Sequence, residues 1–140
     1  MASTHAISNQ FAMDLPEVSA FYTTHDENGR AIFVNPPPDP CTKWHNPIDN
    51  EQQFFSLFAT SKNPRGPPLV VQNGTCCRMV DFSPGFTSVA HQTVSIDYGV
   101  VIQGTIELLL DSGEKRLISP GGMIVQRGTM HTWRNPSATE

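Results

Sequence analysis

The chain is 140 residues long, with 38% hydrophobic and 16% charged residues, and that size suits one ordinary domain with a single core. Its net charge of −4 and the absence of any Lys or Arg run exclude the basic face that nucleic-acid phosphates require. No stretch approaches the ~20 apolar residues that cross a bilayer, and the N-terminus lacks a signal-peptide pattern. The cysteines are odd in number, and the adjacent pair Cys76 and Cys77 disfavours disulfides. We therefore expect a cytoplasmic protein with reduced thiols and no nucleic-acid or membrane partner.

The first half of the chain predicts strands and loops. Its prolines and glycines, twelve and ten in the whole chain, leave few windows long enough for a helix, which predicts an all-β domain. Residues 17–34 indicate two strands around an Asp26–Gly29 turn, because Asn-Gly readily takes the positive φ of a hairpin. Residues 35–52 hold five prolines and no periodicity, so we expect a loop or covering arm. Residues 52–60 fit a short helix or a strand, and the prolines that follow favour a strand.

The second half predicts short strands bounded by Gly, Pro, Asp or Ser, at the spacing of a β-sandwich or small barrel. We expect these strands at residues 69–71, 76–82, 90–104, 106–110, 115–118 and 123–126. The clearest hairpin joins 106–110 to 115–118, because the intervening Asp, Ser and Gly favour turns.

Residues 90–104 carry a polar stripe. Polar side chains occupy every second position, at His91, Thr93, Ser95 and Asp97. On a regular strand this alternation gathers them on one face. Tyr98 has the opposite parity, so we expect it to point outward or into a dimer contact.

Two segments carry a recognisable spacing. The first comprises Gly85, His91, Thr93, Asp97 and Gly104. The second runs from Gly121 to Asn135 and contains Gln126, Gly128 and His131. Together and in this order they resemble the two signatures of the cupin superfamily, and the chain is further similar to single-domain cupins of fungal and microbial biosynthetic gene clusters.

The chain departs from the two signatures at several positions. The first signature has a His where Thr93 stands and a Glu where Asp97 stands. In the second signature, Gln126 replaces a Pro and Gly122 replaces an Asp.

The resemblance implies a double-stranded β-helix, a jelly-roll barrel that holds a small molecule. We expect residues 1–75 to form an N-terminal arm, hairpin and loop that pack on a barrel core of residues 76–140. Cupins of this type place a further strand after the second signature, whereas this sequence ends five residues past Asn135. An unpaired edge is a liability, so we expect the N-terminal segment or a second subunit to cover it, and we favour a homodimer.

The resemblance also implies a divalent metal, such as Fe, Mn, Ni, Cu or Zn, held by His91, Asp97 and His131. Thr93 cannot replace the missing imidazole. On a straight strand His91 and Asp97 would lie about 20 Å apart, so the metal requires a bend at residues 94–96, where β-branched residues prefer extension. A metal-free site is the alternative, in which the two imidazoles act as general acid and base and Asp97 assists.

The other site residues are candidates for substrate contact, and structural roles compete with this reading. Thr93, Ser95, Phe86 and Trp133 would line the pocket, although aromatic side chains often belong to a core. His131 could instead bond the Arg127–Thr129 turn. Asp97 could form an ion pair with Arg127 or Arg134.

Three functions follow for this chain. The leading hypothesis is a tailoring enzyme that acts on a carbonyl-bearing, polyketide-like metabolite by acid-base chemistry, as an isomerase, dehydratase, cyclase or decarboxylase. The second is an iron-dependent oxidoreductase or dioxygenase, and the third is a non-catalytic ligand-binding protein. No dinucleotide fingerprint is present, which argues against a nicotinamide enzyme.

Overall fold

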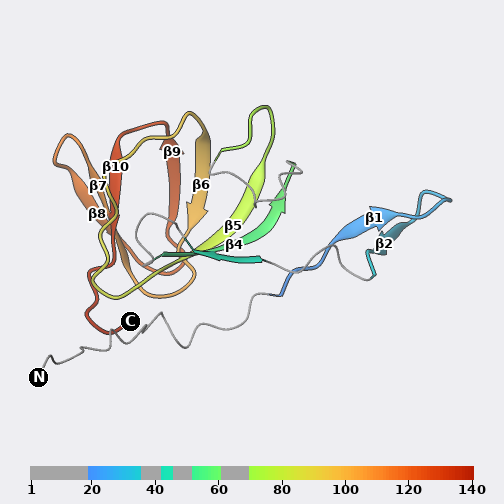
Figure 1. The fold of residues 1–140 in the computed structure, drawn as a ribbon, viewed down its shortest axis with the longest axis horizontal. Helices are drawn as coiled ribbons and strands as arrows, with labels where there is room; N and C mark the ends of the chain where they lie inside the picture. Colours follow the sequence, from blue (N-terminus) through green and yellow to red (C-terminus); the bar gives the residue numbers. More distant parts are fainter. Residues whose placement is uncertain (1–18, 36–41, 46–51, 61–69) are drawn as a thin grey trace, which may run out of the picture. The chain divides into compact units, whose positions relative to one another are not determined.

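The computed structural model describes residues 19–35, 42–45, 52–60 and 70–140, with backbone only at 42–45. The described residues form ten β-strands and no helix, which confirms the all-β class (Figure 1). None of them belongs to a helix suited to crossing a membrane. Contacts divide the chain into two compact units, one containing residues 82–140 and the other residues 16–81. The expected division into residues 1–75 and 76–140 stays a prediction.

The unit of residues 16–81 contains the expected N-terminal hairpin. Strands β1 (Thr23–His25) and β2 (Ala31–Phe33) pair antiparallel. Asp26 closes the turn, because its carboxylate accepts hydrogen bonds from the backbone N–H groups of Asn28 and Arg30, both at 2.9 Å. The Arg30 backbone bond is the leading reason why the pKa of Asp26 is lowered.

The same unit holds a three-stranded sheet in the order β3-β4-β5. Its strands are β3 (Thr42–His45), β4 (Gln52–Ala59) and β5 (Cys76–Phe82), and Phe54 and Phe55 are buried on β4. Strands 52–60 and 76–82 are confirmed. The prediction of only loop or arm over residues 35–52 is wrong at β3, because pairing with β4 imposes a strand that no local pattern signals. The strand expected at 69–71 is also wrong, since residue 70 bends and residue 71 is irregular, while residue 69 lies outside the described residues.

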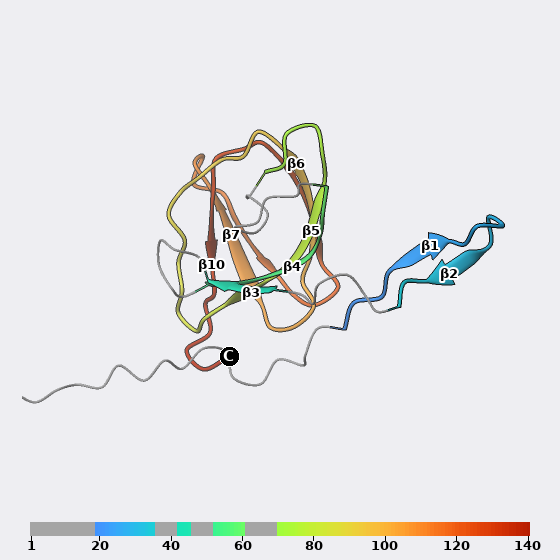
Figure 2. The same ribbon diagram turned by 45° about the vertical axis from the view of Figure 1, so that its right-hand side comes forward.

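The unit of residues 82–140 contains two sheets, visible from two directions in Figures 1 and 2. One sheet has the order β10-β7-β8 and the other pairs β6 with β9. Their bounds are β6 (Ile96–Val100), β7 (Ile106–Leu110), β8 (Lys115–Ile118), β9 (Met123–Arg127) and β10 (His131–Arg134). The predicted β7–β8 hairpin is confirmed, and Gly113 takes φ 87° in its turn.

An irregular segment extends the larger sheet. Residues 86–91 run antiparallel to β10 on the side away from β7, with bridges from Thr87 to Arg134 and from His91 to His131. Phe86 is 3% exposed, its ring centroid lies 5.8 Å from that of Phe82, and its carbonyl accepts from the Asn135 backbone N–H. Phe86 therefore belongs to the core of this unit.

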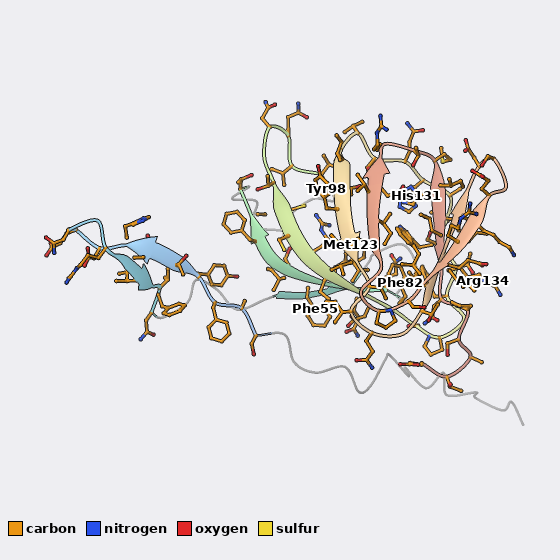
Figure 3. All side chains as sticks on the ribbon, turned by 180° about the vertical axis from the view of Figure 1, so that it is seen from behind. Phe55, Phe82, Tyr98, Met123, His131 and Arg134 are labelled. Atoms are coloured by element: carbon orange, nitrogen blue, oxygen red, sulfur yellow. The ribbon has the colours of Figure 1, made fainter. Side chains whose placement is uncertain are left out.

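The stretch of residues 90–104 is not one continuous strand. The chain bends at Val94 and Ser95, and only Ile96–Val100 is a regular strand. The bend that metal ligation by Asp97 would require is thus present, against the extended preference of the β-branched Val94. The opposite parity of Tyr98 is confirmed, because its side chain is 78% exposed while Asp97 is half-buried (Figure 3).

Candidate functional site

The two signature histidines face each other across neighbouring strands. His91 and His131 exchange both backbone hydrogen bonds, each 2.9 Å long, so their side chains leave the sheet on the same face. Their ring centroids lie 4.4 Å apart, and the rings are tilted by 54°. His131, labelled in Figure 3, is 4% exposed. The Trp133 ring meets the His131 ring edge-on, with the ring centroids 5.7 Å apart. The structure thus brings together the two residues that the sequence marked most strongly.

A β-bulge places His91 on this face. Thr87 pairs with Arg134, and His91 pairs with His131, so residues 88–90 oppose only residues 132 and 133. One extra residue in the segment turns His91 onto the face that Trp133 and His131 share. Ser88 stabilises the bulge, because its hydroxyl accepts from the Trp133 N–H at 3.0 Å and donates to the Val89 carbonyl at 3.1 Å.

Both imidazoles use Nδ1 for structure. His91 Nδ1 lies 2.9 Å from the Val89 carbonyl oxygen, and His131 Nδ1 lies 2.8 Å from the Thr129 carbonyl oxygen. A carbonyl oxygen only accepts, so Nδ1 carries the proton in each neutral ring and Nε2 presents a lone pair. The structural prediction for His131, a bond to the turn, is therefore confirmed at one nitrogen while the other is left for chemistry.

The environment favours the neutral form of His131. Burial lowers the pKa of His131 below its ordinary value of 6.5, and positive charge on His91 lowers it further. The hydrogen bond to Thr129 and the charge of Asp97 oppose this shift. The net direction is downward, which keeps the Nε2 lone pair of His131 unprotonated at neutral pH.

Asp97 is held by hydroxyl groups. Its two carboxylate oxygens accept from Thr93 Oγ1 at 2.9 Å and from Ser95 Oγ at 2.7 Å. Arg134 instead approaches Glu107 at 3.3 Å. No ion pair of Asp97 occurs among the described residues, so the predicted pairing with Arg127 or Arg134 is wrong. Thr93 and Ser95 therefore orient Asp97 in addition to any contact with a substrate.

The donor set does not form the expected three-ligand metal site. Within the described ranges, no three His, Cys, Asp or Glu side chains lie close enough to hold a metal ion. The free Nε2 atoms of His91 and His131 suit a metal, but the carboxylate of Asp97 is engaged by its two hydroxyl partners. Metal ligation by His91, Asp97 and His131 stays a prediction.

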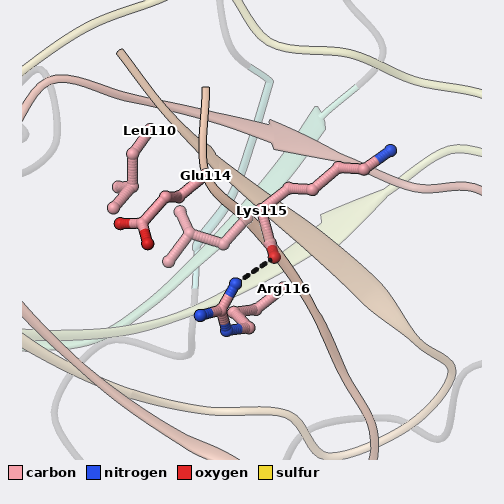
Figure 4. Close-up of a pocket in the computed structure, with 5 residues that line it drawn as sticks. Leu110, Glu114, Lys115 and Arg116 are labelled. Atoms are coloured by element: carbon pink, nitrogen blue, oxygen red, sulfur yellow. Dashed lines mark hydrogen bonds between the residues drawn. The ribbon is translucent and has the colours of Figure 1, made fainter. Parts of the chain in front are cut away.

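Apolar side chains continue the histidine face of the sheet. Leu110 is the strand partner of His131, and Leu108 is the partner of Trp133. A pocket of about 210 Å³ adjoins them, lined by Leu108, Leu110, Glu114, Lys115 and Arg116 (Figure 4). The apolar surface therefore lies directly beside both His131 and Trp133. The substrate contact expected for Trp133 stays a prediction. For Phe86 the burial against Phe82 favours the core reading.

The sequence did not predict two polar residues of the second signature, Thr129 and Gln126, as site residues. Thr129 holds His131 through its carbonyl, and its hydroxyl donates to Gln126 Oε1 at 3.1 Å. Gln126 is 6% exposed and is the strand partner of Asp97. The available signal was Gln126 itself, because a long amide replaces a Pro at a position next to the histidine turn.

Known proteins resemble this chain over most of its length. A protein named cupin-domain-containing oxidoreductase srdD from Neurospora crassa is 48% identical over 138 residues, covering 89% of this chain and 69% of that protein. Oryzines biosynthesis cluster protein J from Aspergillus oryzae is 37% identical over 144 residues, covering 91% and 79%. Cupin-domain-containing oxidoreductase virC from Hypocrea virens is 37% identical over 128 residues, covering 81% and 64%.

These similarities show the family. The chain belongs to the cupin superfamily, and its fold is the double-stranded β-helix of that family. It spans between 64% and 79% of the length of the three relatives. No protein-family model matches the chain.

Proposed function

We propose that this cupin is a tailoring enzyme that moves protons on a carbonyl-bearing, polyketide-like small molecule. The observation that carries the proposal is the 4.4 Å approach of two imidazoles whose Nδ1 atoms are both engaged by carbonyl oxygens. A relative named as an oryzines biosynthesis cluster protein supports a role in the biosynthesis of a small molecule.

The proposed step is proton abstraction next to a carbonyl. Nε2 of neutral His131 takes a proton from the carbon, and the electron pair of the broken C–H bond forms a C=C bond as the carbonyl oxygen gains negative charge. His91 in its protonated form returns a proton at another atom, which gives an isomer. Where the neighbouring carbon carries a hydroxyl group, protonated His91 gives its proton to that group instead, which leaves as water while the carbonyl re-forms and the C=C bond shifts toward the carbon that lost it, giving a dehydration. His131 suits the role of base because burial lowers its pKa.

Deuterium exchange tests this proposal without knowledge of the natural substrate. The chain is incubated with cyclohexanone or 1-tetralone in D₂O, and loss of the α-proton signal is followed by NMR. We expect His131→Gln and His91→Gln to lower the exchange rate by about 10²–10⁴-fold, the range for loss of a general acid or base. His25→Gln is the matched control, because His25 is exposed in the N-terminal hairpin.

The outcomes separate the functions. Exchange that is unchanged in both His91→Gln and His131→Gln contradicts the proposal. Tight binding of a metabolite that is recovered unaltered supports a ligand-binding protein instead.

An oxidoreductase is the second candidate, favoured by the printed names of srdD and virC. An oxidase would remove two hydrogen atoms from its substrate and pass two electrons and two protons to dioxygen, giving hydrogen peroxide. Substrate-dependent dioxygen uptake, together with about one iron per chain that is lost in His131→Ala, would favour this candidate over proton transfer alone.

A further inference from the structure

Gln126 carries a buried polar group that the proposed site does not yet use. Its side chain lies at the end of β9 and is 6% exposed. Its Oε1 accepts the hydrogen bond of the Thr129 hydroxyl at 3.1 Å, and the Thr129 carbonyl in turn holds His131 Nδ1 at 2.8 Å. Gln126 is therefore connected to the catalytic imidazole of His131 through a single intervening residue, Thr129.

The other end of the same amide has no partner. Nε2 of Gln126 is buried and makes no hydrogen bond within the described part of the chain. Asp97 is its strand neighbour, but the carboxylate of Asp97 is already bonded by Thr93 and Ser95. A buried N–H group without an acceptor destabilises the fold and is rare in folded proteins. A bound ligand with a hydrogen-bond acceptor would satisfy this group.

Support of the histidine turn does not require this nitrogen. Thr129 contacts only Oε1, so a side chain with an acceptor alone would hold the turn equally well. The signature that the chain resembles has a Pro at this position, which offers no side-chain donor. The amide donor is thus an addition that the turn itself does not explain.

We propose that Gln126 Nε2 donates a hydrogen bond to the carbonyl oxygen of the substrate. The inference rests on the proposed function, in which His131 Nε2 accepts the α-proton and the oxygen becomes an enolate. A donor aimed at this oxygen stabilises the transition state more than the ground state, because the charge develops there. The terminal torsion of a Gln side chain has a broad energy minimum. The buried amide can therefore rotate toward a ligand while the Thr129 hydroxyl keeps its hydrogen bond to Oε1.

The test compares three substitutions in the whole chain. Gln126→Met removes both ends of the amide, and Thr129→Val removes only the hydroxyl that holds Oε1. Gln103→Met is the matched control, because Gln103 is exposed in the same unit. The probe is 4-nitrophenolate, whose anionic oxygen resembles that of an enolate, and its binding is followed by absorbance.

We expect Gln126→Met to weaken 4-nitrophenolate binding by at least ~10-fold, and Thr129→Val to change it by less than ~3-fold. In the ketone exchange assay, Gln126→Met should lower kcat by about 10²-fold with little change in KM, as for loss of one oxyanion donor. Gln126→Glu serves if Gln126→Met does not fold, because it keeps the acceptor for Thr129 and removes the donor.

Two results overturn the inference. Equal losses of 4-nitrophenolate affinity in Gln126→Met and Thr129→Val would show that the amide only positions the turn. No binding of 4-nitrophenolate to the unaltered chain would show that Gln126 does not form a site for an anionic oxygen. Failure of the proposed function is distinguishable from both. In that case no ketone exchanges its α-protons, while 4-nitrophenolate binding still depends on Gln126.

Discussion

His91 and His131 are cross-strand partners that present their second imidazole nitrogens from one face of a bulged sheet. The backbone pair fixes the separation of the rings, and the Val89 and Thr129 carbonyls fix their orientation. This arrangement makes the site sensitive to changes in the backbone as well as in the histidines.

The bulge is the first such feature. The bulge accommodates one extra residue, so insertion of one alanine between Ala90 and His91 places the inserted residue opposite His131 and turns His91 to the opposite face of the sheet. We expect α-proton exchange to fall to the level of His91→Gln, measured with cyclohexanone in D₂O. Insertion of one alanine after Gln103, an exposed residue of a loop, is the control. Full activity after the insertion at Ala90 would contradict the assigned geometry.

The lowered pKa of His131 links stability to pH. The folded state holds its proton less tightly than the unfolded state, so the unfolded state binds more protons below pH 6.5. We expect the free energy of unfolding to fall as pH falls below 6.5, by at most ~1.4 kcal/mol per pH unit, and to level off below the folded pKa. Urea unfolding at several pH values measures it. His131→Gln should remove this component, and an unchanged pH dependence would refute it.

Thr93→His tests what limits metal binding. The substitution restores the imidazole of the family signature and frees one oxygen of Asp97, whose partner is the Thr93 hydroxyl. We expect affinity for Co²⁺ to rise by at least ~10-fold, about 1.4 kcal/mol, followed by the visible absorbance of the ion. Thr93→Val is the control, because it frees the carboxylate without adding a ligand. Equal Co²⁺ affinity in the two variants would show that this position is not a ligand position.

Substitution of Gly128 tests how tightly the turn before His131 packs against Thr93. Its φ is +64°, and a Cβ there would lie 3.0 Å from the Thr93 carbonyl oxygen. We expect Gly128→Ala to lower the free energy of unfolding by about 1–3 kcal/mol, measured with denaturant, and to slow α-proton exchange. Gly104→Ala is the matched control, because Gly104 also has positive φ but has no atom within 4 Å of such a Cβ. Equal effects of the two substitutions would mean that the contact with Thr93 is unimportant.

Local chemistry made much of the fold predictable. The turn at Asp26–Gly29 and the β7–β8 hairpin follow from residues that favour positive φ or bond their own backbone, and the parity of Tyr98 follows from strand geometry. The features that the sequence did not indicate depend on contacts between residues far apart in the chain. Strand β3 exists through β4, and the bend at Val94 is accompanied by the close approach of Gly128 to the neighbouring carbonyls.

The candidate site was predictable to a similar extent. Signature spacing identified both histidines. It could not reveal the bulge, because the bulge is defined by the pairing of residues 87–91 with β10. It also could not reveal that two hydroxyl groups hold Asp97. The unpartnered amide of Gln126 is likewise visible only once its surroundings are packed.

The protonation of the two imidazoles tests the central claim most directly. The chain is labelled with ¹⁵N-histidine, and the ring nitrogens of His91 and His131 are assigned by comparison with His91→Gln and His131→Gln. In the neutral form, we predict a protonated Nδ1 and an unprotonated Nε2 in both rings, as their bonds to Val89 and Thr129 require. A neutral ring with its proton on Nε2, in either residue, would contradict the account.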